Sequence, residues 1–194
     1  MRPLHLLAPL LLMSALHACT SMDALRPREH LDRRTGATLT MAAQPWIFAR
    51  EQPHLAVHAR DYLSLQAVEV NVGGQLARYL VVFDWSTVDR REHAAPRQRR
   101  LILELDDRSW ILQGEGVDPR AAGISEWPLK SPGLGAHLHV YPADEDLLRY
   151  WRLATDARVR SEGDPDDPDA RLETWRDGRA ALAALLDGGS PLKE

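Results

Sequence analysis

The stretch RDYLSLQAVEVNVGGQLARYLVVFDWSTVD, residues 60–89, decides the fold. In its first half three valines alternate with polar residues, which is typical of a strand with one solvent-exposed face. Gly73 and Gly74 follow, and two consecutive residues that accept a positive φ favour a two-residue hairpin turn. In the second half both alternating faces are apolar. This return strand is therefore predicted to lie inside a sheet that is covered on both sides.

The first strand of this hairpin has an irregular pattern. Leu63 and Leu65 are out of phase with Val68 and Val70. A β-bulge inserts one extra residue into a strand and would absorb such a slip. The sequence therefore predicts a bulge near Gln66.

The amino terminus has the layout of a secretory signal peptide. Residues 1–18, MRPLHLLAPLLLMSALHA, carry one positive charge near the start and then an apolar run that ends near Ala18. The run is too short to span a bilayer as a helix, and a proline interrupts it. A positive start followed by a short apolar stretch indicates a signal peptide that is removed from the mature protein.

The residues around the expected cleavage site, Leu16-His17-Ala18-Cys19, resemble the lipobox of bacterial lipoproteins. In that motif leucine stands three positions before the cysteine and a small residue stands directly before it. The resemblance implies that Cys19 is lipidated, for example with palmitate, and becomes the first residue of the mature protein. Thr20, instead of Asp, follows the cysteine, which resembles lipoproteins that are exported to the outer membrane.

The cysteine content agrees with this interpretation. Cys19 is the only cysteine, so no disulfide can form within the chain. Two acyl chains anchor a protein stably, at about 0.8 kcal/mol per buried methylene, whereas one chain anchors it marginally. The sequence thus predicts a membrane partner through the lipid anchor, on the periplasmic side of the outer membrane. The stretch from Tyr62 to Arg90 is also similar to uncharacterised proteobacterial lipoproteins, a resemblance that implies no activity.

The mature chain is predicted to form one domain. Residues 19–37 are interpreted as the lipidated N-terminus and a polar, basic tether, and residues 38–190 as a single β-rich globular domain. Residues 114–135, rich in glycine and proline, predict a long loop of a kind that is often functional or disordered. Helices are expected near Asp144 and Asp177. The predicted fold class is β-rich α+β, an antiparallel sandwich or a curved sheet with two helices near the C-terminus.

Charge and motifs limit the possible functions. The formal net charge is −4, and −5 once the leader with Arg2 is removed, which is unlike a general nucleic-acid binder. The sequence contains no GxSxG motif and no phosphate-cradling glycine loop. No cofactor is therefore predicted and an enzyme is not favoured, although the many carboxylates leave a catalytic pair open.

Four histidines are the weak candidates for metal ligands. His137 and His139 are two positions apart on a predicted strand, so both point to one face. His54 and His58 are four positions apart, as ligands on a helix would be. Four imidazoles could hold zinc or copper, but neither pair lies in an HExxH motif and nothing places the pairs together. No metal site is predicted.

Two other features could bind a ligand. An arginine-rich segment contains Arg90, Arg91, Arg97, Arg99 and Arg100. Guanidinium groups bind phosphate in a bidentate manner, so this segment could contact anionic lipid, although an exposed connecting loop is the simpler interpretation. Trp127 lies in the predicted long loop. It could stack on a sugar or anchor a protein partner, and it could equally plug the end of a sandwich.

The favoured hypothesis is a non-enzymatic lipoprotein of the cell envelope. Its β-rich domain would bind another envelope protein or component, or assist an assembly, beside the outer membrane. One alternative is an envelope hydrolase or metal-dependent enzyme that uses the histidines and carboxylates. A further alternative is a binder of anionic lipid or glycan that uses the arginine-rich segment and Trp127.

Overall fold

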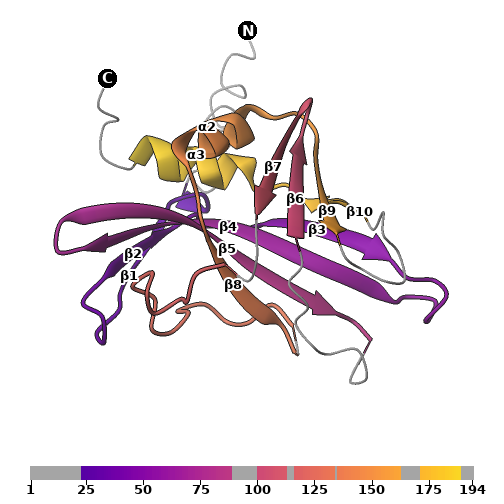
Figure 1. Cartoon of the computed structure of the whole chain (residues 1–194), viewed down its shortest axis with the longest axis horizontal. Coiled ribbons are helices and arrows are strands. Elements are labelled where there is room, and N and C mark those ends of the chain that lie inside the picture. Colours follow the sequence, from indigo (N-terminus) through magenta and orange to yellow (C-terminus); the bar gives the residue numbers. More distant parts are fainter. Residues whose placement is uncertain (1–22, 89–99, 113–115, 134, 163–170, 189–194) are drawn as a thin grey trace, which may run out of the picture.

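A single open antiparallel sheet forms the body of the protein in a computed structural model (Figure 1). The structure describes residues 23–88, 100–112, 116–133, 135–162 and 171–188, and ten strands and the two helices named here lie within them. The strands are β1 (Arg28–Leu31), β2 (Thr38–Met41), β3 (Trp46–Glu51), β4 (Arg60–Val72), β5 (Gln75–Ser86), β6 (Arg100–Leu105), β7 (Arg108–Leu112), β8 (His137–Pro142), β9 (Ala157–Glu162) and β10 (Arg171–Arg176). The helices are α2 (Glu145–Leu153) and α3 (Arg179–Gly188). The predicted α+β class with two late helices is confirmed.

The central hairpin forms as predicted. β4 and β5 pair without a break from Asp61 opposite Ser86 to Val72 opposite Gln75. The turn between them is Gly73 and Gly74, whose φ angles are 59° and 87°. Two positive φ angles match the right-handed twist of the flanking strands, which is why this position requires glycine.

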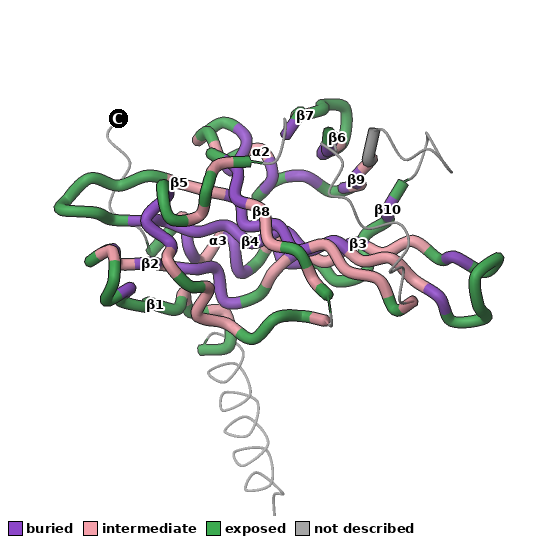
Figure 2. Tube along the Cα trace, turned by 60° about the horizontal axis from the view of Figure 1, so that its bottom comes forward, coloured by how far each residue is buried: buried purple, intermediate pink, exposed green. Residues whose placement is uncertain are grey.

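β4 is the strand around which the sheet is organised. One edge of β4 pairs with β5 over its whole length, and the other edge is shared by β2 and β3. β5 in turn pairs with β8, so β5 is an internal strand, as its two apolar faces predicted. The eight residues from Leu63 to Val70 are all buried, and Figure 2 shows this stretch as the buried centre of the sheet.

Each face of the sheet has its own hydrophobic core. Leu63 and Leu65 point to the first face, where they pack with both helices and with β6 and β9. Val68 and Val70 point to the second face, where they pack with β2 and the loop before β8. The predicted bulge near Gln66 is therefore wrong, because the register with β5 is unbroken. The change of phase in the sequence reflects burial on opposite faces instead.

The sheet is curved, and it is not a two-sheet sandwich. The strand order runs β1-β2-β4-β3-β10-β9-β6-β7, with β5 beside β4 and β8 beside β5. Figure 1 shows β6 and β7 rising steeply from β4 and β5 on the side that the helices cover. Of the two predicted architectures, the curved sheet is therefore the one that forms. Two further hairpins form, one from β6 and β7 and one from β9 and β10.

The fold begins earlier than the sequence predicts. Residues 19–37 were expected to be a tether, but β1 pairs with β2 inside this range. Asp32 is 3% exposed and Ala37 is fully buried. The Asp32 carboxylate accepts hydrogen bonds from the backbone N–H and the hydroxyl of Ser125, at 2.6 and 2.8 Å. The polar composition of this segment thus did not reveal an exposed edge strand and, after it, a buried carboxylate that bonds within the protein.

The loop between β7 and β8 covers the second face. Ala122 and Ile124 in this loop are buried in the second-face core. The backbone N–H of Val117 donates to the carbonyl of Val140 at 2.7 Å, which places the start of the loop beside β8. The predicted long loop at 114–135 thus has a packing role in the part that the structure describes.

The helices close the first face. The Asp144 side chain accepts a hydrogen bond from the N–H of Leu147 at 2.6 Å and so caps α2. Leu147, Leu148 and Trp151 form the buried face of this helix. No helix in the described part of the chain combines the length and the apolar character that a membrane crossing needs.

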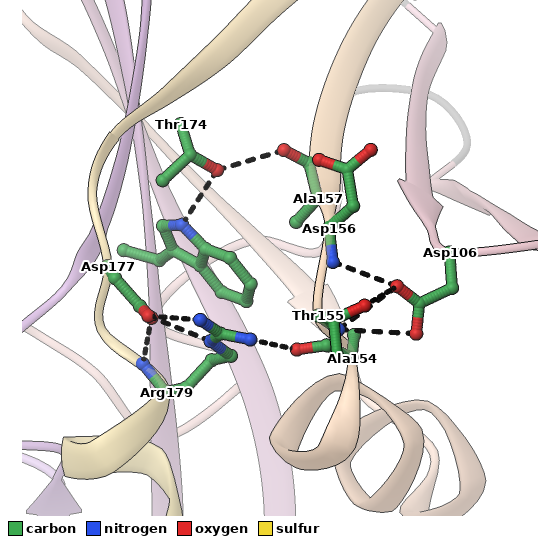
Figure 3. A network of polar contacts seen from close by, with 9 residues as sticks. Asp106, Ala154, Thr155, Asp156, Ala157, Thr174, Asp177 and Arg179 are labelled. Carbon is green, nitrogen blue, oxygen red and sulfur yellow. Dashed lines mark hydrogen bonds and ion pairs between the residues drawn. The ribbon is translucent and has the colours of Figure 1, made fainter.

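A polar network joins the two helices to the late hairpin (Figure 3). The Asp106 carboxylate accepts hydrogen bonds from the backbone N–H groups of Thr155 and Asp156, at 3.0 and 2.8 Å. These bonds lower the pKa of Asp106, with the bond from Asp156 contributing most. The Arg179 guanidinium donates to the carbonyl of Ala154 and to the carboxylate of Asp177. The network therefore fixes the connections that follow α2 and precede α3.

Candidate functional site

The histidines that sequence analysis singled out do not form a metal site. His54 and His58 are exposed in the loop between β3 and β4, whereas His137 and His139 lie on β8. His139 Nε2 is 3.3 Å from one carboxylate oxygen of Asp84, and His137 Nδ1 is 3.9 Å from the other. The described residues contain no group of three or more histidine, cysteine, aspartate or glutamate side chains that could hold a metal ion.

Asp84 marks the polar end of the first face. In register, Asp84 lies opposite Leu63, and the next position along β4 on the same face is Asp61. The Asp61 carboxylate is 3.3 Å from Arg50 and accepts a hydrogen bond from the amide of Gln52 at 2.7 Å. In these contacts each carboxylate lies beside a histidine, an arginine or an amide. Such pairing lowers the cost of placing polar side chains where the apolar core ends.

Trp127 belongs to the second-face core. Its ring packs edge-on against Phe83 with ring centroids 5.9 Å apart and an interplanar angle of 61°. Trp127 is half-buried, and it packs with the cluster that contains Ile124 and Val140. Two kinds of role were considered for Trp127 from sequence. Its position fits closure of a core better than presentation of a free ring to a sugar.

The other residues singled out from sequence lie mostly outside the described part of the chain. This holds for Cys19 and for Arg90, Arg91, Arg97 and Arg99. Arg100 is exposed at the start of β6, where its backbone pairs with Glu162 of β9. The structure therefore gives no placement for the lipidation site or for most of the arginine-rich segment.

A row of aromatic rings on the second face is the candidate site that sequence analysis missed. Tyr62 and Trp85 stack with ring centroids 5.1 Å apart and ring planes 10° apart. Trp175 meets Tyr62 edge-on, with centroids 6.2 Å apart and planes at 81°. The guanidinium carbon of Arg60 lies 4.7 Å from the centroid of the Trp175 ring. We call Tyr62, Trp85, Trp175 and Arg60 the aromatic row.

Two local features of the backbone produce this row. The hairpin turn at 73–74 places Tyr62 directly opposite Trp85. The register between β10 and β3 shifts between Thr174 and Arg176, so Trp175 is an extra residue at an irregularity. Such bulges often re-aim a side chain. The first contact was detectable from the hairpin alone, whereas the contact with Trp175 depends on strands that are distant in sequence.

The members of the row differ in how much surface they present. Trp85 is half-buried and stacks on Tyr62, and a Cβ atom at Gly133 would lie only 2.5 Å from the indole Cδ1. Trp175 is 54% exposed. Arg60 is held over the Trp175 ring by Glu51, whose carboxylate accepts a hydrogen bond at 2.8 Å and raises the pKa of Arg60. The row is therefore a fixed, partly exposed surface with one cation.

The row consists of residue types that are common in binding surfaces. Tryptophan, tyrosine and arginine are the residue types that contribute most to the centres of protein interfaces. No protein-family model, curated protein or solved structure matches this chain. The class that the described residues define is accordingly a β-rich α+β domain with an aromatic row on one face of a curved sheet.

Proposed function

We propose that this chain is an envelope lipoprotein whose β-rich domain binds a protein partner through the aromatic row. The lipobox-like segment that ends at Cys19 supports a lipid anchor, and the export leader supports a position in the cell envelope. The role is non-enzymatic. The domain holds a partner or assists an assembly beside the outer membrane.

The observation that carries the binding role is the exposed indole of Trp175 with the Arg60 guanidinium stacked on it. An exposed tryptophan retains about half of its surface for a partner, and burying that surface releases water from a large apolar ring. Arg60 adds a charged donor that is already oriented by Glu51. A side chain that is fixed before binding loses less conformational entropy when the partner arrives.

A protein partner fits the row better than a glycan does. Sugars stack on the flat face of an aromatic ring, and one face of Trp85 is stacked on Tyr62, with Gly133 close to the indole. Arg60 covers one face of Trp175. The row offers a partly covered indole and a cation to a partner, and protein side chains pack readily against such a surface.

The anchor is tested by acylation. Cells that express the full chain are fed labelled palmitate, and the wild type is compared with Cys19→Ala. We expect label on the wild type and none on the variant. Unlabelled wild-type protein, or a variant that carries as much label as the wild type, would refute the lipoprotein role.

The binding role is tested by crosslinking in intact cells followed by purification of the chain. We expect Trp175→Ala to lose the crosslinked partner, since interface tryptophans at this kind of position contribute about 2 kcal/mol or more, or roughly 30-fold in affinity. Leu153→Ala is the matched control, because Leu153 is 74% exposed on α2 and outside the row. Equal recovery of the partner with both variants would contradict the assignment.

A further inference from the structure

Four exposed arginines lie at the two ends of β1, the first strand of the fold. They are Arg26, Arg28, Arg33 and Arg34, which we call the N-terminal arginine cluster. We propose that this cluster is a membrane-docking surface that binds the phosphate headgroups of anionic phospholipids. The proposal rests on the lipid anchor of the proposed function, and it adds the side of the domain that faces the membrane.

The first argument is distance along the chain. Asp23 is the first described residue and follows Cys19 by four positions. Four residues of fully extended chain span at most about 14 Å. The chain then joins the domain at once, because Leu25 packs against the first-face core and the Arg26 N–H donates to the carbonyl of Asp23 at 3.2 Å. An acylated Cys19 therefore holds this side of the domain against the bilayer.

The second argument is the position of β1 in the sheet. Among the strands that the structure describes, β1 pairs with β2 alone, and all four of its residues are exposed. Figure 2 shows β1 as an exposed strand outside the buried centre of the sheet. The strand that comes first after the anchor is thus also a free edge of the sheet. An orientation with this edge towards the bilayer brings the arginines on both ends of β1 to the lipid surface.

The third argument is that the turn after β1 is fixed. The Asp32 carboxylate accepts hydrogen bonds from the backbone N–H groups of Arg34 and Thr35, at 2.9 and 3.2 Å. The Thr35 hydroxyl donates to the carbonyl of Gly123 at 2.7 Å, which ties the turn to the loop on the second face. The backbone of Arg33 and Arg34 is therefore held in place instead of lying on a mobile tail.

The fourth argument is the availability of the guanidinium groups. No ion pair to a described carboxylate is recorded for any of the four arginines, in contrast to most arginines of the sheet and helices. Those pairs include Arg60 with Glu51, Arg78 with Glu69, Arg152 with Asp187, Arg158 with Glu173 and Arg179 with Asp177. An unpaired guanidinium can bind a phosphate oxygen pair directly. Near an anionic bilayer each such residue strengthens association by about fivefold.

A simpler role for charge on β1 is to protect a free edge from pairing with another chain. That role does not depend on lipid, whereas the proposed docking surface requires negative headgroups. The test therefore compares bilayers that differ only in headgroup charge. Acylated full-length protein from membranes is placed in nanodiscs of phosphatidylcholine alone or with phosphatidylglycerol, and backbone hydrogen exchange is followed by mass spectrometry.

We expect the amides of residues 26–35 to exchange about tenfold more slowly in the anionic discs than in the neutral discs, with the difference lost in 0.5 M salt. The triple variant Arg28→Gln, Arg33→Gln and Arg34→Gln should lose the protection. The control variant Lys130→Gln, Arg171→Gln and Arg176→Gln removes the same charge from exposed positions elsewhere and should keep it.

The intact mass of the same sample shows whether Cys19 is acylated, so it tests the lipid anchor separately from the docking surface. Acylated protein with equal exchange in both kinds of disc would overturn the docking surface and leave the lipid anchor standing. Protein with no acyl group on Cys19 would overturn the anchor and the docking surface together. Aggregation of the triple variant with unchanged lipid dependence would assign the arginines to edge protection instead.

Discussion

Tyr62 and Trp85 stack across the β4–β5 hairpin with their ring centroids 5.1 Å apart and their planes within 10°. Both residues are half-buried, and the stack lies where the second-face core gives way to exposed surface. The pair fixes the end of the longest hairpin and supports the exposed Trp175 ring beside it. The same contact therefore bears on stability and on the proposed binding surface.

The stacking of Tyr62 and Trp85 should be measurable as a coupling energy. We expect Tyr62→Leu and Trp85→Leu to be non-additive by about 0.5–1.5 kcal/mol in urea unfolding, because leucine keeps apolar area but loses the ring contact. Tyr62→Leu combined with Trp110→Leu is the control. Trp110 packs against Tyr150 on the first face, so these two changes should add within about 0.5 kcal/mol. Equal coupling in both pairs would rule out a specific stack.

The ion pair between Glu69 and Arg78 should behave as a buried pair. Arg78 Nε is 2.8 Å from the carboxylate, and the side chains are 15% and 7% exposed for Arg78 and Glu69. Arg78→Met leaves the Glu69 carboxylate buried without this partner, so we expect a loss of about 3 kcal/mol or more in the free energy of unfolding. The double variant Glu69→Leu and Arg78→Met should recover most of the loss, which chemical denaturation would reveal.

An exposed pair gives the comparison for that experiment. Arg149 is 2.6 Å from Glu145 on α2, and the two side chains are 54% and 43% exposed. We expect Arg149→Met to cost less than about 0.5 kcal/mol, since water and salt screen such pairs. A loss as large as that of Arg78→Met would contradict the distinction between the buried and the exposed pair.

Gly116 is required because the loop approaches β8 closely. A Cβ atom at Gly116 would lie 2.2 Å from the carbonyl oxygen of Val140, and its φ is 82°. Gly135 has a φ of 68° but no atom within 4 Å of a Cβ position, so Gly135→Ala isolates the backbone strain of about 1–2 kcal/mol. We expect Gly116→Ala to cost about 3 kcal/mol or more in urea unfolding. Similar losses for the two variants would show that the loop moves away from β8 without penalty.

Asp32 should make the stability of the protein depend on acid pH. Its hydrogen bonds, first of all the one from the Ser125 hydroxyl, hold the pKa of Asp32 well below its usual value. The ionised form therefore stabilises the fold above the unfolded-state pKa of about 3.9, and this contribution is lost as the pH falls further. We expect Asp32→Asn to be less stable at neutral pH and to lose less stability between about pH 4 and pH 2.

The exposed residue Asp146 on α2 provides the control for the pH experiment. Urea midpoints measured across this pH range for Asp146→Asn should follow the wild type. If Asp32→Asn lost as much stability in acid as the wild type does, the prediction would be wrong. The Asp32 carboxylate would then not link the turn after β1 to Ser125 in the way that its contacts indicate.

Local patterns were sufficient for the hairpins and the late helices. The Gly73–Gly74 turn sets which residues of β4 and β5 face each other, so the stack of Tyr62 on Trp85 follows from the sequence. The acidic residues from Asp144 to Asp146 likewise indicated a helix in this region, and α2 begins at Glu145. In contrast, the phase change between Leu65 and Val68 predicted a bulge, because a single strand does not reveal that its two faces are buried by different partners.

The sequence by itself determined the β-rich class, the central hairpin, the two late helices and the lipobox-like segment at Cys19, because each depends on residues that are close in the chain. Tertiary structure alone decided that β1 joins the sheet, that the sheet curves instead of forming a sandwich, and that Trp175 meets Tyr62. Contacts of that kind join distant strands; Trp46 and Thr174, for example, are bonded although they are 128 positions apart. Such pairings are selected by the shared burial of whole strands, which no local pattern encodes.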